Sequence, residues 1–285
     1  MFVRIFIAGA MGVIGRYAVP LLVGAGHEVT GITRSQERAT ELDRLGATSH
    51  VVDVYDREKL MEAVRAAQPE VVINLLTDLA TRNFGGNSRI RMEGTRNLVD
   101  AAKAAGSRRM IAESLAWIYR AGDGPATEDQ PLAFGEDSPR GQNLEAVRIL
   151  EEQSAELPES IILRYGALYG SATFYAIDGG IAQRAKAGKL EATDAVTSFV
   201  HVQDAGSATA AAVDWPVGAY NIVDDQPAAA TAWAPVYAAI VGAQPPVRQA
   251  GSNAWERGAS NAKARSQGWE PAYPSWRQGF AEALG

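Results

Sequence analysis

Short apolar runs alternate with longer amphipathic stretches along the first 165 residues of the chain. The runs are rich in Val and Ile and are bounded by turn-forming residues, which is typical of strands buried on both faces of a parallel sheet. Strands are predicted at residues 4–8, 28–33, 49–52, 71–75, 110–112 and 161–163. Amphipathic helices are predicted between them, at residues 12–24, 36–45, 57–67, 88–105 and 142–155.

This alternation predicts an α/β fold, a Rossmann-type doubly wound parallel sheet with a smaller C-terminal substrate lobe. Right-handed crossovers bring the carboxyl ends of the strands to one edge, where ligands bind in such folds. The second half is less regular, with helices predicted at 203–213 and 231–241 and a strand at 218–223. Short helices pinned by prolines are predicted in the tail, residues 258–280. The expected domains are residues 1–165, with 201–224 returning to them, and a lobe of residues 166–200 and 225–285.

Composition narrows the class of protein. The chain has 285 residues, 47% of them hydrophobic, so it can bury a sizeable core. Its formal net charge of −6 argues against nucleic acid and anionic membranes as partners. The apolar run at the start is too short to span a membrane and lacks the regions of a signal peptide, so a cytoplasmic location is expected.

The chain contains no cysteine, which excludes disulfides, thiolate nucleophiles, thiolate-bound zinc and iron–sulfur clusters. The three histidines, His27, His50 and His201, are far apart and form no pair at ligand spacing. We therefore expect the histidines to be structural and predict no metal site.

Three glycines separate the first predicted strand from the first predicted helix. Gly9, Gly12 and Gly15 follow one another at intervals of three residues. In a dinucleotide-binding turn, one glycine permits the tight turn, one lets the backbone approach the pyrophosphate, and one lets helix and strand pack closely. The helix N-terminus adds free amides and a partial positive charge. We therefore expect an NAD(P) cofactor to bind along Gly9, Ala10, Met11, Gly12, Val13, Ile14 and Gly15.

The end of the second predicted strand indicates which cofactor binds. An acidic residue at this position would bind the ribose 2′-hydroxyl of NAD, whereas this chain has Thr33, Arg34 and Ser35. An arginine can form charge-assisted hydrogen bonds to a 2′-phosphate, so NADP is predicted over NAD. The alternative is that Arg34 is a solvated residue at the start of a helix.

The next two strand ends are expected to hold the rest of the cofactor. Asp53 and Val54 follow the third predicted strand, where an aspartate can meet the adenine amino group and a valine can pack on the ring. After the fourth strand, the backbone of Leu75, Leu76 and Thr77 is expected to pass the cofactor ribose.

Together these segments resemble the extended short-chain dehydrogenase/reductase superfamily, the NAD(P)-dependent epimerase/dehydratase group. The likeness runs nearly end to end, and further segments carry it at residues 93–102, 163–170, 198–204, 218–223, 260–263 and 268–271. The resemblance implies a sheet of about seven parallel strands, an NAD(P) site that includes Gly166 and Leu168, a C-terminal substrate lobe, and often a homodimer formed through two helices per subunit.

The superfamily's usual catalytic groups are Ser or Thr, Tyr, and a Lys four residues after the Tyr that lowers its pKa. Ser114 is expected to fill the first role. The Tyr-x-x-x-Lys element should begin the helix at 142–155, near Asn143 and Val147, and neither residue can do this work. The chain has no lysine between Lys103 and Lys186, so a small shift of register does not restore the pair.

Two other tyrosines are candidate proton donors. Tyr119 and Tyr165 are expected near the nicotinamide end, and either phenol could protonate a developing alkoxide or merely line the pocket. One Tyr-x-x-x-Lys string does occur, at Tyr55 and Lys59, but at the expected adenine end, so it is interpreted as chance. His201 with Asp204 suggests a dyad, whereas the resemblance makes that stretch structural.

The loops at the expected ligand edge carry aromatic residues, namely Trp117, Tyr119, Phe134, Tyr165, Tyr169, Phe174 and Tyr175. Such a lining favours an apolar or ring-containing small molecule over a nucleotide sugar. The leading hypothesis is an NADP-dependent oxidoreductase or epimerase-type enzyme that acts on a small carbonyl or hydroxyl compound. The alternatives are a non-catalytic NADP-binding regulatory or redox-sensing protein, and a non-redox cyclase or isomerase on the same fold.

Overall fold

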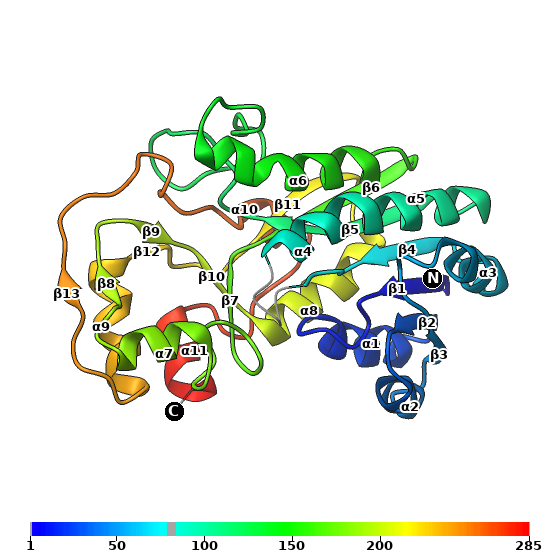
Figure 1. Ribbon diagram of the computed structural model, residues 1–285, viewed down its shortest axis with the longest axis horizontal. Helices are drawn as coiled ribbons and strands as arrows, with labels where there is room; N and C mark the ends of the chain where they lie inside the picture. Colours follow the sequence, from blue (N-terminus) through cyan, green and yellow to red (C-terminus); the bar gives the residue numbers. More distant parts are fainter. Residues whose placement is uncertain (1, 79–83, 285) are drawn as a thin grey trace. The chain divides into compact units, whose positions relative to one another are not determined.

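The computed structural model describes residues 2–78 and 84–284, and the chain forms two compact units (Figure 1). Unit 1 consists of Met1–Ser114, Phe134–Leu163 and Gly206–Ala219. Unit 2 consists of Leu115–Ala133, Arg164–Ala205 and Tyr220–Gly285. Residues 115–133 therefore belong to unit 2, whereas the sequence placed them in the sheet domain.

A seven-stranded sheet has the order β11-β6-β5-β4-β1-β2-β3, which confirms the predicted Rossmann-type doubly wound fold. Its strands are β1 (Arg4–Ala8), β2 (Glu28–Thr33), β3 (Thr48–Val51), β4 (Val71–Asn74), β5 (Arg109–Leu115), β6 (Glu159–Tyr165) and β11 (Gly218–Ile222). β1 pairs in parallel with both β2 and β4, and the strand order reverses between β1 and β4. This switch point is where a dinucleotide binds in such sheets.

Helices cover both faces of the sheet of unit 1, and in Figure 1 α5 and α6 lie on one side of it and α1 and α2 on the other. The helices of this unit are α1 (Gly15–Gly24), α2 (Gln36–Arg44), α3 (Arg57–Ala67), α4 (Phe84–Arg89), α5 (Thr95–Ala104) and α6 (Pro139–Ser154). The side chains of Ser35, Asp56 and Ser138 cap α2, α3 and α6 by accepting backbone N–H bonds. The single helix predicted at 88–105 is wrong in detail, because a π-helical turn, η1 (Ile90–Gly94), joins α4 to α5.

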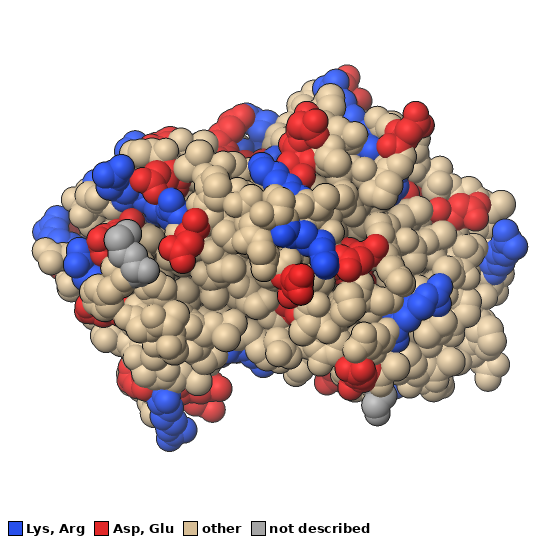
Figure 2. All heavy atoms as spheres, turned by 180° about the vertical axis from the view of Figure 1, so that it is seen from behind, with Lys and Arg blue, Asp and Glu red and all other residues tan. Residues whose placement is uncertain are grey.

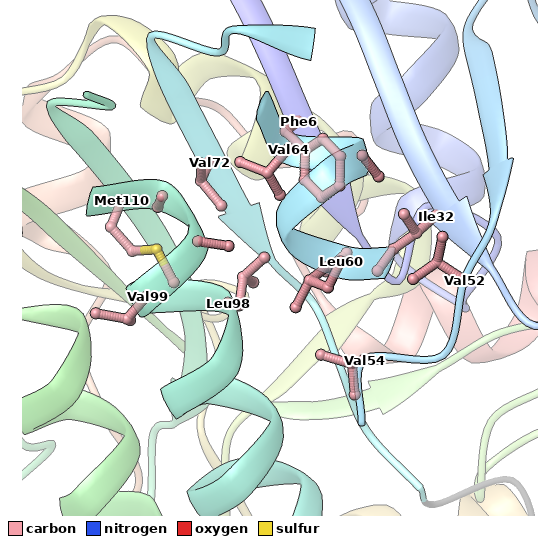
Figure 3. Packing of buried hydrophobic residues seen from close by; sticks show 14 of the residues in the cluster. Phe6, Ile32, Val52, Val54, Leu60, Val64, Val72, Leu98, Val99 and Met110 are labelled. Carbon is pink, nitrogen blue, oxygen red and sulfur yellow. The ribbon is translucent and has the colours of Figure 1, made fainter. Parts of the chain in front are cut away.

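The core of unit 1 lies between the sheet and the helices α3 and α5. Figure 3 shows Phe6 and Val72 from neighbouring strands pointing toward Leu60 and Val64 of α3 and Leu98 of α5. These side chains are fully buried. Burial of each contributes about 1.5–3 kcal/mol, which holds the strand ends that carry the candidate site in a rigid frame.

Unit 2 is built from short strands and helices around an aromatic core. The elements are β7 (Ala167–Tyr169), β8 (Glu191–Ala192), β9 (Val196–Thr197), β10 (Phe199–His201), β12 (Ala228–Ala229), β13 (Val247–Arg248), α7 (Gly180–Lys186), α9 (Ala230–Ile240), α10 (Ala262–Ser266) and α11 (Trp276–Ala283). The remaining elements are α8 (Val202–Ala211) and the 3₁₀ turn η2 (Ala212–Asp214), which follow β10 in the chain. The core packs Phe199 edge-on against Tyr169, Tyr175, Trp233 and Phe280. Short helices in the proline-containing tail were expected.

Charged side chains of both signs are interspersed on the face shown in Figure 2. Many charges in unit 1 are paired across neighbouring helices. Glu156, just after α6, binds Arg96 and Lys103 of α5 at 2.5 and 2.9 Å, and Arg96 also binds Asp100. Among the described residues, no helix has both the length and the apolar character that a membrane span requires.

Candidate functional site

The glycine turn after β1 has the geometry that a pyrophosphate needs. Gly9 adopts φ +89°, a conformation that favours glycine, and a Cβ there would lie 2.6 Å from the carbonyl oxygen of Leu75. A Cβ on Gly15 would lie 2.4 Å from the carbonyl oxygen of Gly9, so only glycine lets α1 start this close to the turn. At Gly12 the sole neighbour within 4 Å is that same oxygen, at 3.1 Å, which leaves room for a ligand to approach. The turn therefore fits a dinucleotide phosphate.

The end of β4 lies beside this turn, and a buried amide fixes its backbone. Asn74 is fully buried; its Nδ2 donates to Oγ1 of Thr95 at 3.0 Å, and its Oδ1 accepts the N–H of Leu76 at 3.2 Å. The N–H of Leu75 bonds the carbonyl of Ala8 at 2.9 Å. The structure thus brings together the two predicted cofactor segments, residues 9–15 and 75–77.

The end of β2 presents the cationic residue that the sequence singled out. Arg34 is exposed, and Arg38 is exposed one turn further along, in α2. Ser35 caps α2 by accepting the N–H of Arg38 at 3.2 Å, and Thr33 is buried. Glu37 is the one acidic residue in the first turn of α2. The position of Arg34 is compatible with a 2′-phosphate contact.

Of the two residues predicted to hold the adenine after β3, the structure gives Val54 a different environment. Oδ1 of Asp53 accepts the N–H of Tyr55 at 3.0 Å, which orients its carboxylate. Val54 is 4% exposed and packs in the core of unit 1 (Figure 3), so its side chain serves the core. Arg89 covers the ring of Tyr55 at 4.1 Å, and Nζ of Lys59 lies 2.9 Å from Asp56. The Tyr55–Lys59 string is thus used for local packing and capping.

Polar side chains from three elements of unit 1 meet at the carboxyl end of β5. Ser114 is 1% exposed, and its Oγ donates to Oε1 of Glu151 in α6 at 2.6 Å. The neighbouring Glu113 pairs with Arg91 of η1 at 3.3 Å, and burial raises the pKa of the Glu113 carboxyl despite this arginine. Sequence reasoning found Ser114 and missed the other three residues. An acidic residue inside a buried strand was the available signal for Glu113.

Tyr119 belongs to a buried network of unit 2. Its hydroxyl donates to Oδ1 of Asn221 at 2.6 Å and accepts from Nη1 of Arg164 at 3.0 Å. The backbone N–H of Asn221 in turn bonds Glu128 at 2.7 Å. Burial raises the pKa of Tyr119 above its usual value. The phenol proton is directed to Asn221, so proton donation to a substrate would require this bond to break.

The remaining predicted residues of unit 2 lie around the ends of β6 and β7. Tyr165 is buried, and its carbonyl accepts the N–H of Ala116 at 2.9 Å. A Cβ on Gly166 would lie 2.6 Å from the carbonyl oxygen of Ser198, so the backbone leaves no room for a side chain at this position. Leu168 is half-buried and lies opposite Val200 in the β7–β10 pair. Tyr169 is fully buried in the aromatic core, so it is a core residue of unit 2.

His201 and Asp204, which the resemblance implied to be structural, both make contacts within unit 2. Burial lowers the pKa of His201 to about 4, and its ring packs against Tyr273 at 4.2 Å. The carboxylate of Asp204 accepts the backbone N–H groups of Ala272 and Tyr273 at 2.7 and 3.0 Å. It therefore anchors the C-terminal segment, a role beyond the helix-capping position expected from the sequence.

Comparison with known proteins agrees with this geometry. Residues 5–222 match the model of the NAD dependent epimerase/dehydratase family. A curated relative, the 3-diazoavenalumate denitrifying reductase of a Streptomyces species, is 41% identical, and the alignment covers 97% of this chain and 99% of that protein. A UDP-N-acetyl-alpha-D-glucosaminuronate decarboxylase of Bacillus cytotoxicus is 26% identical over 74% of this chain and 71% of its own length.

Solved structures share the fold at low sequence identity. The UDP-glucose 4-epimerase of Thermotoga maritima with UDP-glucose superposes with a TM-score of 0.75 at 20% identity, covering 100% of this chain and 97% of its own. The WbmG enzyme of Bordetella bronchiseptica, in complex with NAD and UDP, gives 0.77 at 19% identity, covering 100% and 94%. The sequence motifs, the sheet order and these matches lead to one conclusion: the chain belongs to the NAD-dependent epimerase/dehydratase family, whose members include epimerases, dehydratases and reductases.

Proposed function

We propose that this protein is an NADPH-dependent reductase that replaces the diazo group of a small aromatic compound by hydrogen. The observation that carries this proposal is the 41% identity, over nearly the whole length of both chains, to a reductase whose name describes removal of nitrogen from a diazo compound. Tyr169 and Tyr175, which the sequence placed at the ligand edge, are packed in the core of unit 2, so the aromatic class of substrate rests on this relative and not on an aromatic lining.

The cofactor site fits a dinucleotide, since Gly9 and Gly15 permit the turn and Gly12 leaves room at its surface. Bound there, a reduced nicotinamide would supply a hydride. In the net reaction a C–H bond forms with the hydride electron pair, the C–N bond breaks, and nitrogen departs as N₂ with the electrons of that bond. Atoms and charge balance for an arenediazonium ion without a further reductant.

This chemistry agrees with the departure from the Tyr/Lys pair. Reduction of a carbonyl creates an alkoxide that must be protonated, which is the task of that pair. Loss of N₂ creates no alkoxide, so a proton donor on α6 is not needed. Val147, one of the two positions where the pair was expected, is 1% exposed and packs as an apolar residue.

The cofactor preference is tested by titration of the protein with NADPH and NADH, followed by cofactor fluorescence. Arg34→Ala is expected to weaken NADPH binding roughly 10- to 100-fold, since hydrogen bonds to charged groups contribute about 1.5–3 kcal/mol, and to leave NADH unchanged. Arg44→Ala, which removes an exposed arginine in the last turn of α2, the helix that follows Arg34, is the matched control. Equal affinity of the wild type for both cofactors would refute the preference.

The reaction is tested with NADPH and an arenediazonium substrate, measuring NADPH absorbance and released N₂ together. One N₂ per NADPH oxidised is expected, and the arene should carry one deuterium when the transferred hydride is labelled. Cofactor binding without turnover of any diazo compound would favour the regulatory alternative. Product formation at constant NADPH would favour a non-redox enzyme.

A further inference from the structure

The hydroxyl of Ser114 lies at the strand end nearest to the expected nicotinamide. The glycine turn follows β1, β4 is the neighbour of β1, and β5 is the neighbour of β4. A dinucleotide lies across the switch point between β1 and β4, with its adenine half toward β2 and β3. Its nicotinamide half then extends toward β4 and β5, and Ser114 is the last residue but one of β5.

The single proton of this hydroxyl is already committed. Oγ of Ser114 donates to a carboxylate oxygen of Glu151 at 2.6 Å, the length of a strong charge-assisted hydrogen bond. With 1% of Ser114 exposed, bulk water does not compete for that proton. A serine hydroxyl has one donor and two acceptor positions, so only acceptor positions remain for a ligand.

The adjacent carboxylate cannot take the place of Glu151 in this pair. Glu113 pairs with Nη2 of Arg91, and both side chains are 8% exposed. Arg91 therefore holds Glu113 while Glu151 holds Ser114, so the two neighbouring side chains have different partners. Glu151 is therefore the group that decides which way the Ser114 proton points.

We propose that the Ser114–Glu151 pair selects a positively polarised nitrogen group over a carbonyl, because it presents an acceptor at the position where carbonyl reduction requires a donor. A carbonyl oxygen gains negative charge as hydride arrives and is stabilised by donors. A diazonium group carries positive charge and is stabilised by the lone pairs of Ser114. Ser114 is the contacting residue and Glu151 the positioning residue. The identity of the substrate rests on the proposed function, whereas the donor–acceptor argument does not.

Glu151→Gln tests this inference directly. The glutamine amide can donate to Ser114, which frees the serine proton to face the ligand. The measurement is the ratio of dissociation constants for phenyltrimethylammonium and tert-butylbenzene, a cation and its neutral isostere, with NADPH bound. The wild type should favour the cation through Coulombic attraction to the serine lone pairs and the carboxylate behind them. The variant should lose roughly tenfold or more of that preference, since the attraction between two charges at contact distance near a protein surface exceeds the free energy of a tenfold change in a dissociation constant. The ratio of kcat/KM for an arenediazonium ion over benzaldehyde should fall in the same direction.

Two further variants separate the pair from general effects. Glu152→Gln removes the same charge from the next residue of α6, which binds Arg148 and has a side chain 61% exposed, and should leave both ratios unchanged. Ser114→Ala keeps the carboxylate and removes the acceptor, and should lose the preference as Glu151→Gln does. Retention of the full preference in Ser114→Ala would overturn the role of the serine.

The outcomes distinguish this inference from the proposed function. A wild type that favours the cation through Glu151 but reduces no diazo compound would refute the proposed function and support the inference. A wild type that reduces the diazonium ion, with both ratios unchanged in Glu151→Gln and Ser114→Ala, would refute the inference and leave the proposed function in place.

Discussion

Alanine at position 15 would place its Cβ 2.4 Å from the carbonyl oxygen of Gly9 and 2.5 Å from that of Ala10. Both are backbone atoms of the cofactor turn, so no side chain can rotate away. Ordinary contact begins at 3.4 Å, so the turn or α1 must move by about 1 Å. Overpacking of this kind costs about 1–3 kcal/mol, of which a better helix former recovers up to about 1 kcal/mol.

The expected result for Gly15→Ala is a loss of about 1–2 kcal/mol in the free energy of unfolding. The Kd of NADPH should rise roughly tenfold or more, because one misplaced hydrogen bond to a phosphate contributes about 1.4 kcal/mol or more. Urea unfolding followed by circular dichroism and fluorescence titration with NADPH measure the two effects.

The matched control is Gly24→Ala, at the other end of α1. A Cβ there meets no heavy atom within 4 Å, so this variant should bind NADPH as the wild type does and be equally stable or slightly more stable. Wild-type affinity for NADPH in a folded Gly15→Ala protein would refute the assignment of this turn to the pyrophosphate.

Three predictions concern unit 2. Tyr119→Phe leaves the buried groups of Asn221 and Arg164 without the phenol and should cost about 1–3 kcal/mol of stability, measured by urea unfolding; an unchanged midpoint would contradict the network. Asp204→Ala removes the acceptor for two backbone N–H groups and should speed hydrogen exchange at residues 272 and 273, and unchanged exchange would exclude the anchoring role. Burial raises the pKa of Asp224 from 3.8 to about 8, so the folded state binds this proton more tightly than the unfolded state, and stability should decline as pH rises from about 4 to 8. Asp224→Asn should flatten that decline, and an identical pH profile of unfolding would refute this assignment.

The sequence predicted the elements of the sheet well where both faces of a strand are buried. The bounds of β1 and β2 and of the helix α3 coincide with the predicted residues, because their apolar patterns end at turn residues and caps. The strand predicted at 161–163 is longer in the structure, where β6 runs from Glu159 to Tyr165. The polar residues at its start lie outside the apolar run that the prediction used, and Glu159 among them binds Arg109 of β5. The π-helical turn η1 was not predicted, because one extra residue in a turn leaves the apolar pattern nearly unchanged.

The sequence by itself determined the fold class, the glycine turn and the departure from the Tyr/Lys pair, because each depends on residues close together in the chain. Only the tertiary structure decided which partners the polar side chains have. Ser114 and Glu151 are 37 residues apart, Tyr119 and Asn221 are 102 apart, and local periodicity carries no information about either pair. Hydrogen-bond partners are chosen by the packing of elements that meet only in the folded chain, and this choice turned Tyr119 toward Asn221 and Ser114 toward Glu151.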